Sequence, residues 1–159
     1  MSETSPARPE DGRGILELAS RIAVFSPAEK ACVEELWNEY LSRGEVSGYF
    51  FLAHRDNGHV LGYACYGPRA LTSSAFDLFW IAVDPDLQGR GIGRVLVSRV
   101  EAEVQAAGGT LLLVETSGKP AYEPTRRFYE SCGYHSQAVI RDFYAAGDDL
   151  VIFTKYFLM

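Results

Sequence analysis

The chain of 159 residues, 47% hydrophobic and 23% charged, is long enough for one domain with a complete core and has the composition of a folded globular protein. Its net charge of −6 argues against general nucleic-acid binding, which needs a basic surface. No apolar run approaches the roughly 20 residues of a membrane span, and residues 1–14 lack the apolar segment of a signal peptide. We therefore expect a cytoplasmic protein with neither a membrane nor a nucleic-acid partner.

Charge and cysteine content bear on possible ligands. A net negative charge favours a cationic partner such as an amine, but it also serves solubility alone. The cysteines Cys32, Cys65 and Cys132 are odd in number and far apart, and the histidines show no ligand spacing. Neither a disulfide framework nor a bound metal is expected.

The N-terminal third is predicted to be mostly helical. Residues 1–14 are polar and contain several prolines and glycines, which indicates a loose tail. Periodic apolar residues predict a helix over residues 15–24. Ser26 as N-cap and Glu29 at position N3 form a capping box, which predicts a second helix that ends at Gly44.

From Tyr49 onward the pattern changes to strands. The first two strands flank Asn57-Gly58, a dipeptide typical of a hairpin turn. Helices are predicted from Ile92 to the pair Gly108-Gly109 and over residues 125–132. Apolar runs predict strands over residues 49–55, 60–66, 76–83, 110–114, 136–144 and 150–157.

The order of these elements predicts the fold class. A helix connects the strands at 76–83 and 110–114, so these two strands are expected to run parallel. The prediction is an α/β fold with one domain over residues 15–159. Its central sheet is mixed and mostly antiparallel, with one parallel strand pair and flanking helices.

A glycine-rich loop follows the strand at 76–83. Gly89, Gly91 and Gly93 occupy alternate positions between an Asp-Pro turn and the next helix. A strand, a glycine loop and a helix N-terminus together point unpaired backbone N–H groups at a phosphate. A P-loop would need Gly-Lys-Ser/Thr, and the dinucleotide fingerprint needs a third glycine three residues after the second. Neither pattern is present, so a phosphate-binding loop of another kind is expected.

The loop resembles the acetyl-CoA site of the GNAT superfamily of N-acetyltransferases. Gln88, Gly91 and Gly93 fit the Gln-x-x-Gly-x-Gly pattern of that family. Residues 125–134 resemble its A-R-x-F-Y-x-x-x-G-F segment, and residues 141–149 resemble its closing hairpin. The resemblance implies a GNAT-like fold with acetyl-CoA as co-substrate. The family's first strand normally precedes the first helix, but only the proline-rich residues 5–9 stand there, so that strand is expected to be short or absent.

In that family the loop amides hold the CoA pyrophosphate, and the preceding strand pairs with the pantetheine arm and supplies an N–H for the oxyanion. Arg90 and Arg94 flank the loop and either contact the pyrophosphate or form a solvated helix start. At residue 122, where many members carry an Asn that contacts CoA, this chain has Tyr122. By this resemblance the cofactor-binding residues are Ile81, Ala82, Val83, Gln88, Gly89, Arg90, Gly91, Ile92, Gly93 and Arg94.

Acetyl transfer to an amine also needs a general base and a proton donor for the departing thiolate. The resemblance makes Tyr129 the proton donor; the alternative is an aromatic packing face of a short helix. Glu115, at the C-terminal end of an apolar strand, is the candidate base or a carboxylate paired with Arg126 or Arg127. Asp77, the lone charge in its strand, is the second candidate base.

Two classes of function remain open. The first is an acetyl-CoA-dependent N-acetyltransferase that moves an acetyl group to a primary amine by direct attack on the thioester. The second is a non-catalytic acyl-CoA-binding module on the same fold, and a weaker third interpretation is a dehydrogenase-type site that would bind NAD. The presence of Tyr129 and Glu115 favours the enzyme. The pattern leaves open whether the acceptor is a small molecule or a protein amino group, and whether the chain forms a homodimer.

Overall fold

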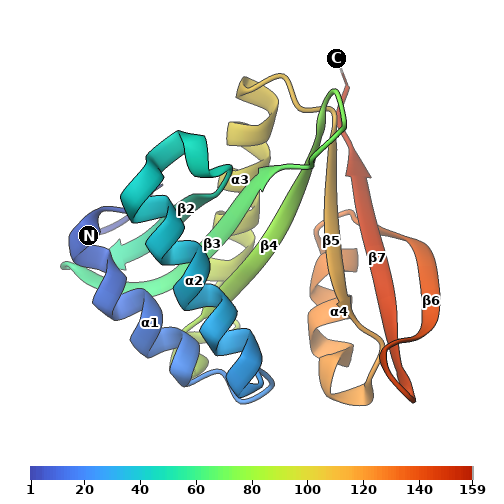
Figure 1. Cartoon of the computed structure of the whole chain (residues 1–159). Helices are drawn as coiled ribbons and strands as arrows, with labels where there is room; N and C mark the ends of the chain where they lie inside the picture. The colour runs from blue at the N-terminus through green and yellow to red at the C-terminus, as the bar shows by residue number, and fades with distance from the viewer. Residues whose placement is uncertain (159) are drawn as a thin grey trace.

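A seven-stranded sheet forms the centre of the computed structural model, which describes residues 1–158 (Figure 1). The elements, with 3₁₀ helices labelled η, are β1 (Ser2–Pro6), η1 (Pro9–Asp11), α1 (Gly12–Ser20), α2 (Pro27–Arg43), η2 (Gly44–Ser47), β2 (Phe50–Asp56), β3 (His59–Pro68), β4 (Ala75–Val83), η3 (Pro85–Leu87), α3 (Ile92–Ala106), β5 (Leu111–Ser117), η4 (Pro120–Tyr122), α4 (Glu123–Ser131), β6 (His135–Ala145) and β7 (Asp148–Tyr156). The strand order is β1-β2-β3-β4-β5-β7-β6, and every neighbouring pair except β4 and β5 is antiparallel. The predicted α/β fold with one parallel pair is confirmed; residue 159 of the predicted domain lies outside the described residues.

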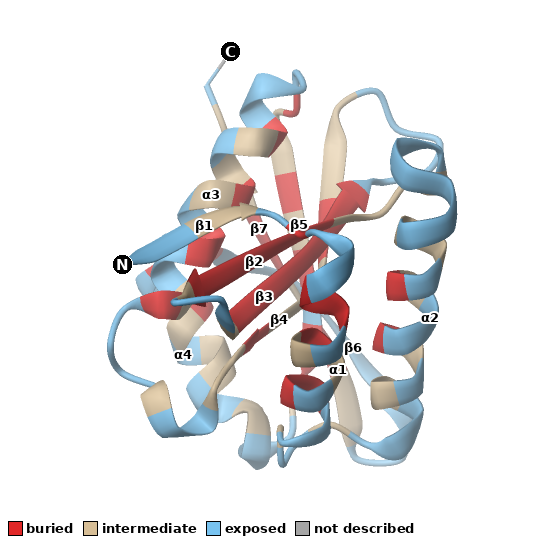
Figure 2. Ribbon diagram, turned by 90° about the vertical axis from the view of Figure 1, so that its left-hand side faces the viewer, coloured by how far each residue is buried: buried red, intermediate tan, exposed pale blue. Residues whose placement is uncertain are grey.

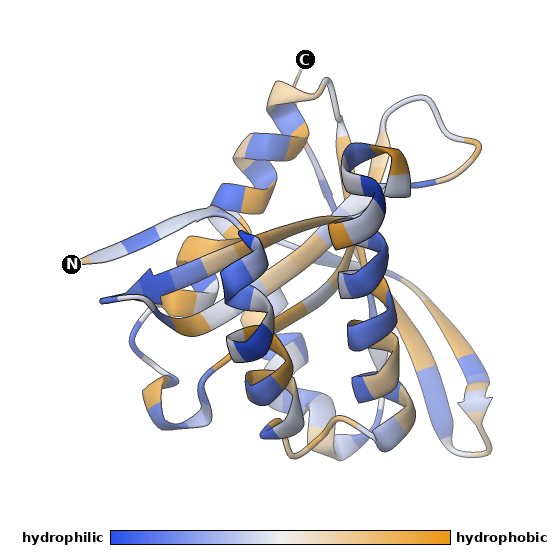
Figure 3. Cartoon of the chain, turned by 60° about the vertical axis from the view of Figure 1, so that its left-hand side comes forward, coloured by the Kyte–Doolittle hydropathy of each residue, from blue (hydrophilic) through white to orange (hydrophobic). Residues whose placement is uncertain are grey.

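Helices cover both faces of the sheet, which therefore has two hydrophobic cores (Figure 2). On one face, called the α1/α2 face, Ile15 of α1 and Trp37 of α2 pack against the strands. On the other, called the α3/α4 face, Leu96 of α3 and Tyr129 of α4 do so. The outward sides of α1 and α2 are largely hydrophilic (Figure 3), as expected for amphipathic helices. None of the helices within residues 1–158 combines the length and apolarity that crossing a membrane requires.

The N-terminal segment forms a strand instead of a loose tail. β1 pairs antiparallel with β2 along its whole length. The buried guanidinium of Arg55, on β2, donates from Nε to Asp11 Oδ1 at 2.7 Å and from Nη1 to Ser5 Oγ at 2.6 Å. These bonds fasten β1 and η1 to the sheet. Of the two expectations for this segment, a loose tail or a short first strand, the structure has the strand, over Ser2–Pro6.

The first helix begins and ends earlier than predicted. The predicted range was 15–24, whereas α1 spans Gly12–Ser20 because η1 leads directly into its first turn. After α1 the chain turns toward α2, and the Phe25 ring packs edge-on against Trp80 at a centroid distance of 5.2 Å. The other predicted elements differ from the observed ones only in their end residues.

The parallel strands β4 and β5 separate part-way along their length. Their pairing stops where Leu78 lies opposite Val114. On the other side of β4, the register with β3 shifts next to Phe79, which has no partner on β3. This bulge bends the strand. From Phe79 to the end of β4, the strand edge that faces β5 is therefore open.

Candidate active site

The glycine loop leaves backbone N–H groups free at the start of α3. Gly89 and Gly91 have φ of +82° and +83°, a left-handed conformation that glycine adopts at little cost. α3 begins directly after Gly91, so the N–H groups of Ile92, Gly93 and Arg94 have no intrahelical acceptor. They donate to no other backbone carbonyl in the described part of the chain. With the positive end of the helix dipole, these N–H groups can hold a phosphate.

The loop residues Arg90, Gly93 and Arg94 have different surroundings. Arg94 donates from Nη2 to Ser131 Oγ at 3.1 Å and from Nη1 to the Ser131 carbonyl at 3.3 Å, which ties α3 to the end of α4. A Cβ at Gly93 would lie 3.1 Å from the Phe128 ring, so glycine lets the start of α3 pack closely on α4. Arg90 is exposed. A phosphate contact from either arginine side chain stays a prediction.

The open edge of β4 presents backbone N–H groups at Ile81 and Val83. The N–H of Asp84, just after the strand, donates to the Leu61 carbonyl of β3 at 2.8 Å. Successive N–H groups along a strand point to opposite sides, so those of Val83 and Ile81 point away from β3. The pairing between β4 and β5 has already ended at this point. These N–H groups are therefore placed to bind an extended ligand or a developing oxyanion.

Tyr129 is buried on the α3/α4 face with an available hydroxyl. The residue is 4% exposed, and its ring packs against Phe128, Tyr134 and Phe153 at centroid distances of 5.5, 6.0 and 5.8 Å. Its hydroxyl has no hydrogen-bond partner among residues 1–158, yet it is not sealed in the core as the unpartnered Tyr63 hydroxyl is. Burial raises the pKa of Tyr129, so the hydroxyl is protonated at neutral pH. The hydroxyl therefore carries a proton and has no described partner that would hold it, although the raised pKa makes it a weaker acid than a phenol in water.

Glu115 and Asp77 lie on the opposite face of the sheet from Tyr129. Side chains of consecutive strand residues point to opposite faces. On β5, Val114 points into the α3/α4 core, so Glu115 points to the α1/α2 face. On β4, Leu78 points into the same core and leaves Asp77 on the α1/α2 face. An amine could therefore reach the open strand edge from one face while a leaving group departs toward the other.

One guanidinium joins the two candidate bases. Arg69, in the connection between β3 and β4, places Nη1 3.0 Å from Asp77 Oδ1 and 3.0 Å from Glu115 Oε1. Burial raises the pKa of Asp77, although its hydrogen bond from Arg69 acts in the opposite direction. The partners considered from the sequence, Arg126 and Arg127, form other bonds: the first donates to backbone carbonyls and the second to a carboxylate of its own helix. Glu115 is therefore paired, but the predicted partners are wrong: the cation is Arg69, and not Arg126 or Arg127.

A cavity of about 320 Å³ opens beside these charges. Its lining includes Arg69, Asp77, Tyr49 and Phe79. The rings of Tyr49 and Phe79 meet edge to face at a centroid distance of 5.4 Å, which makes part of the wall aromatic. In the described part of the chain, no three His, Cys, Asp or Glu side chains gather as a metal site requires. The space and its polar groups suit a small amine or the end of a longer one.

Sequence reasoning assigned no contact to two residues of this region, Arg69 and Tyr122. Arg69 reaches Glu115 across a separation of 46 residues, and no local pattern links them. Tyr122 donates its hydroxyl to the Val24 carbonyl at 3.0 Å and lies 3.3 Å from Glu29 Oε2. It thereby fastens η4 to the connection between α1 and α2. The departure from the family's Asn at residue 122 was the one available signal for this contact.

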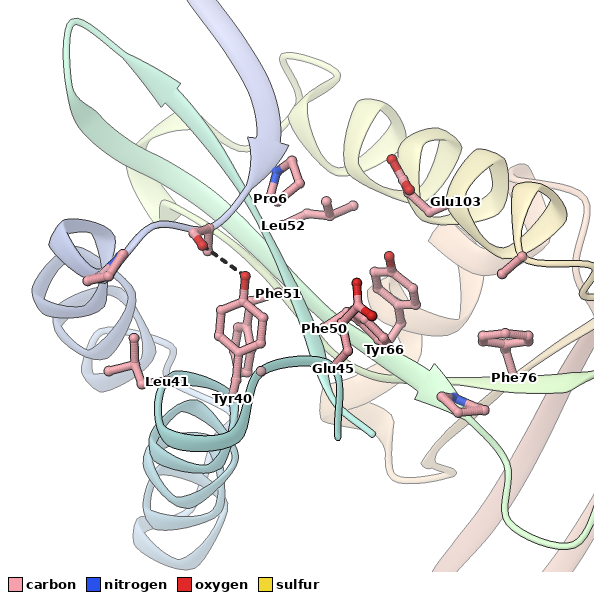
Figure 4. Close-up of a pocket in the computed structure, with 15 residues that line it drawn as sticks. Pro6, Tyr40, Leu41, Glu45, Phe50, Phe51, Leu52, Tyr66, Phe76 and Glu103 are labelled. Atoms are coloured by element: carbon pink, nitrogen blue, oxygen red, sulfur yellow. Dashed lines mark hydrogen bonds between the residues drawn. The ribbon is translucent and has the colours of Figure 1, made fainter. Parts of the chain in front are cut away.

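A larger cavity of about 700 Å³ lies between β2, the end of α2 and α3 (Figure 4). Phe50 and Tyr66 stack in its wall at a centroid distance of 5.4 Å. The Tyr40 hydroxyl donates to the Ala7 carbonyl at 2.9 Å beside it. None of the site residues predicted from the sequence lines this cavity. It is therefore separate from the candidate active site.

The family-model comparison matches residues 46–136, more than half of the chain, to the acetyltransferase (GNAT) domain. The chain belongs to the GNAT acetyltransferase family. The matched range contains the open edge of β4, the glycine loop and Tyr129, so the family assignment rests on the same residues that form the candidate site of this GNAT protein.

Solved structures and curated relatives agree with this assignment. A GNAT-family protein from Desulfovibrio desulfuricans, known from its crystal structure, is 39% identical in sequence to this chain. The two structures superpose with a TM-score of 0.95 over 98% of this chain and 99% of that one. The ribosomal protein bS18-alanine N-acetyltransferase of Salmonella typhimurium is 36% identical over 78 residues, 47% of this chain and 51% of the relative. This GNAT chain thus spans about half the length of that curated relative. The yncA structure from Salmonella typhimurium, with its cofactor acetyl-CoA, shares the fold at 22% identity and a TM-score of 0.75 over 98% of this chain and 93% of that one.

Proposed function

We propose that this GNAT protein is an acetyl-CoA-dependent N-acetyltransferase that transfers the acetyl group to a primary amine by direct attack on the thioester. The observation that carries the proposal is the presence of three features in one chain, each suited to one part of the reaction. These are the free N–H groups at the start of α3, the open edge of β4 and the unpartnered hydroxyl of Tyr129. The acetyl-CoA bound to the yncA relative supports the same co-substrate here.

The free N–H groups of α3 and of β4 each have a role in the proposed binding of acetyl-CoA. The N–H groups of Ile92, Gly93 and Arg94 bind the pyrophosphate, with Gln88 at the entrance to the loop. The free N–H groups of Ile81 and Val83 bind the pantetheine arm and bring the thioester to the point where β4 and β5 separate. One of these N–H groups stabilises the negative charge that develops on the carbonyl oxygen.

The proposed chemistry uses both faces of the sheet. The amine nitrogen attacks the thioester carbon, and a C–N bond forms as the C–S bond breaks. Glu115, with Asp77 as the second candidate, accepts the proton that the amine loses, directly or through a water. Tyr129 gives its proton to the departing thiolate, which yields CoA with a free thiol. The carboxylate gains one proton and Tyr129 loses one, so the net charge of the protein is unchanged by the transfer.

The acceptor is proposed only as a primary amine. The Salmonella relative acts on the alanine of a ribosomal protein, and it supports a protein amino group as one acceptor class. The cavity of about 320 Å³ supports a small amine equally well. A cytoplasmic location stays a prediction from the sequence, which decides neither for nor against a homodimer.

An acetylation assay tests the proposed function. The purified chain is incubated with acetyl-CoA and a panel of amino acids, polyamines and peptides that begin with alanine, and products are identified by mass spectrometry. We expect one acetylated amine and one CoA thiol for each turnover. Tight CoA binding without transfer to any amine would instead support the non-catalytic acyl-CoA-binding module.

Cofactor choice gives a prediction that needs no acceptor. Acetyl-CoA at about 100 times its dissociation constant is expected to stabilise the fold by roughly 2.7 kcal/mol, or about 5–10 °C in melting temperature. NAD at the same concentration is the control and is expected to leave the melting temperature unchanged. Stabilisation by NAD and none by acetyl-CoA would overturn the proposed co-substrate.

The phosphate site gives a second prediction, at Gly91. Asp and Asn have nearly the same shape and both tolerate the left-handed conformation found at this residue. Gly91→Asp is expected to bind CoA at least about tenfold more weakly than Gly91→Asn, because its carboxylate competes with the pyrophosphate for the N–H groups of α3. Isothermal calorimetry with CoA measures the difference, and melting temperatures verify that both variants fold. Equal affinities would place the phosphates elsewhere.

A further inference from the structure

Arg69 occupies a position between the two candidate bases that no other described cation shares. Its side chain is 46% exposed, whereas that of Asp77 is 8% exposed and that of Glu115 35% exposed. Both carboxylates bond to the same nitrogen, Nη1. Among residues 1–158, no other Lys, Arg or His forms an ion pair with either carboxylate. The charge of the pair is therefore compensated by Arg69 alone.

The backbone that carries Arg69 is held in place by its own loop. The N–H of Arg69 donates to the Ala75 carbonyl at 2.9 Å, which closes the connection between β3 and β4. The Thr72 hydroxyl donates to the Arg69 carbonyl at 2.9 Å and accepts from the Ala75 N–H at 3.3 Å. These bonds fix the backbone at Arg69. Only the rotamer freedom of the Arg69 side chain is then lost when the guanidinium binds both carboxylates.

Other titratable groups near the carboxylates add negative charge or none. On β6, burial and the nearby carboxylates Glu115, Asp148 and Glu29 raise the pKa of Tyr144, which therefore stays neutral. Asp148 has its own cation, Lys119, at 3.7 Å. Without Arg69, burial and the nearby Glu115 would both favour the protonated form of Asp77, with no cation to oppose them. A protonated carboxyl cannot accept the proton of an amine.

We propose that Arg69 is a positioning residue for acetyl transfer: its single Nη1 nitrogen holds the Glu115 and Asp77 carboxylates together, with Glu115 directed toward the acceptor amine. This inference rests on the proposed function. Arg69 itself need not touch the substrate, because it acts through the carboxylates. Its loss is therefore expected to change the pH at which the site works more than the binding of acetyl-CoA.

Two variants at Arg69 and one control variant test the inference. Arg69→Gln removes the charge, and Arg69→Lys keeps it. Arg43→Gln removes an arginine from an exposed pair with Glu39 on α2; neither residue lines the smaller cavity or bonds to Asp77 or Glu115, so this variant serves as the matched control. Carboxyl carbon NMR titration of Glu115 and Asp77 is measured in each, together with the acid limb of kcat/KM for the amine, KM for acetyl-CoA and melting temperature.

In Arg69→Gln, the titration midpoint of Asp77 is expected to rise by about 1–2 pH units, because the hydrogen bond from Arg69 that lowers its pKa is lost, and the acid limb of kcat/KM should move with it. Arg69→Lys is expected to restore most of the wild-type titration, and Arg43→Gln to leave it unchanged. KM for acetyl-CoA should be unaffected throughout. Carboxyl midpoints that do not move in Arg69→Gln, or that move equally in Arg69→Lys, would overturn the role of Arg69.

The titration does not depend on turnover, which separates this inference from the proposed function. A wild-type chain that binds acetyl-CoA but acetylates no amine overturns the proposed function. An active wild-type chain with unmoved carboxyl midpoints in Arg69→Gln overturns only the assignment of Arg69.

Discussion

Tyr129→Phe is expected to lower the rate of acetyl transfer about 10²–10⁴-fold with little change in melting temperature. The ring contacts with Phe128, Tyr134 and Phe153 remain in the variant. The hydroxyl has no partner among residues 1–158, so its removal deletes no internal hydrogen bond. If the proton is given only as the thiolate leaves, the loss acts on the transition state and not on bound acetyl-CoA. KM for acetyl-CoA should therefore stay near its wild-type value.

Tyr134→Phe is the matched control for this prediction. It removes a hydroxyl from a neighbouring aromatic residue in the same core, but that hydroxyl donates to Glu101 at 2.7 Å. We expect a loss of stability of about 1–3 kcal/mol, because the bond goes to a carboxylate, together with near-normal turnover in the folded protein. Single-turnover kinetics separates the chemical step from product release. A Tyr129→Phe variant with a wild-type single-turnover rate would exclude Tyr129 as the essential acid.

Asp11→Ala is expected to destabilise the fold by about 3–5 kcal/mol, the largest effect on stability that we expect in this chain. The side chains of Asp11 and Arg55 are each 4% exposed. The substitution removes the buried counter-ion of the Arg55 guanidinium and leaves it only the half-exposed carboxylate of Glu3, at 3.3 Å. It also removes the acceptor for the Arg8 N–H, which donates to Asp11 Oδ2 at 2.7 Å. Because the same guanidinium holds β1, the first strand should lose its protection from hydrogen exchange at the same time.

The effect is expected to depend on pH. Burial opposes ionisation of Asp11, but hydrogen bonds from Arg55 and from the Arg8 N–H outweigh it, and the pKa of Asp11 is lowered below 3.8. A lowered pKa in the folded state contributes stability above the unfolded value, and this contribution is lost as the pH falls through the folded value. In urea unfolding, the difference between wild type and variant should therefore be full at neutral pH and shrink below about pH 4.

An exposed ion pair on the same strand provides the control. Asp56, at the end of β2, pairs with the N-terminal ammonium of Met1 at 2.9 Å, and its side chain is 44% exposed. Asp56→Ala is expected to cost less than about 1 kcal/mol, because water screens an exposed pair. Similar losses for Asp11→Ala and Asp56→Ala would contradict the view that burial gives the Asp11–Arg55 pair its importance.

Local sequence patterns determined most of the elements and located the glycine loop of the candidate site. The capping box at Ser26 and the hairpin turn at Asn57-Gly58 both form as predicted, the second with positive φ at both residues. The glycine loop could be located because its conformation and its free N–H groups depend on a few adjacent residues. The single parallel strand pair followed from the helix between two apolar runs.

Only the tertiary structure decided the N-terminal strand and the acceptor half of the site. A polar, proline-containing segment becomes β1 because Arg55, from a strand 44 residues beyond Asp11, supplies the bonds that its own sequence lacks. Arg69 meets Glu115, and Tyr122 meets Val24, across 46 and 98 residues. Such contacts form where strand register and helix packing bring distant side chains together, and a residue in a connecting loop carries no periodic pattern that could reveal its partner.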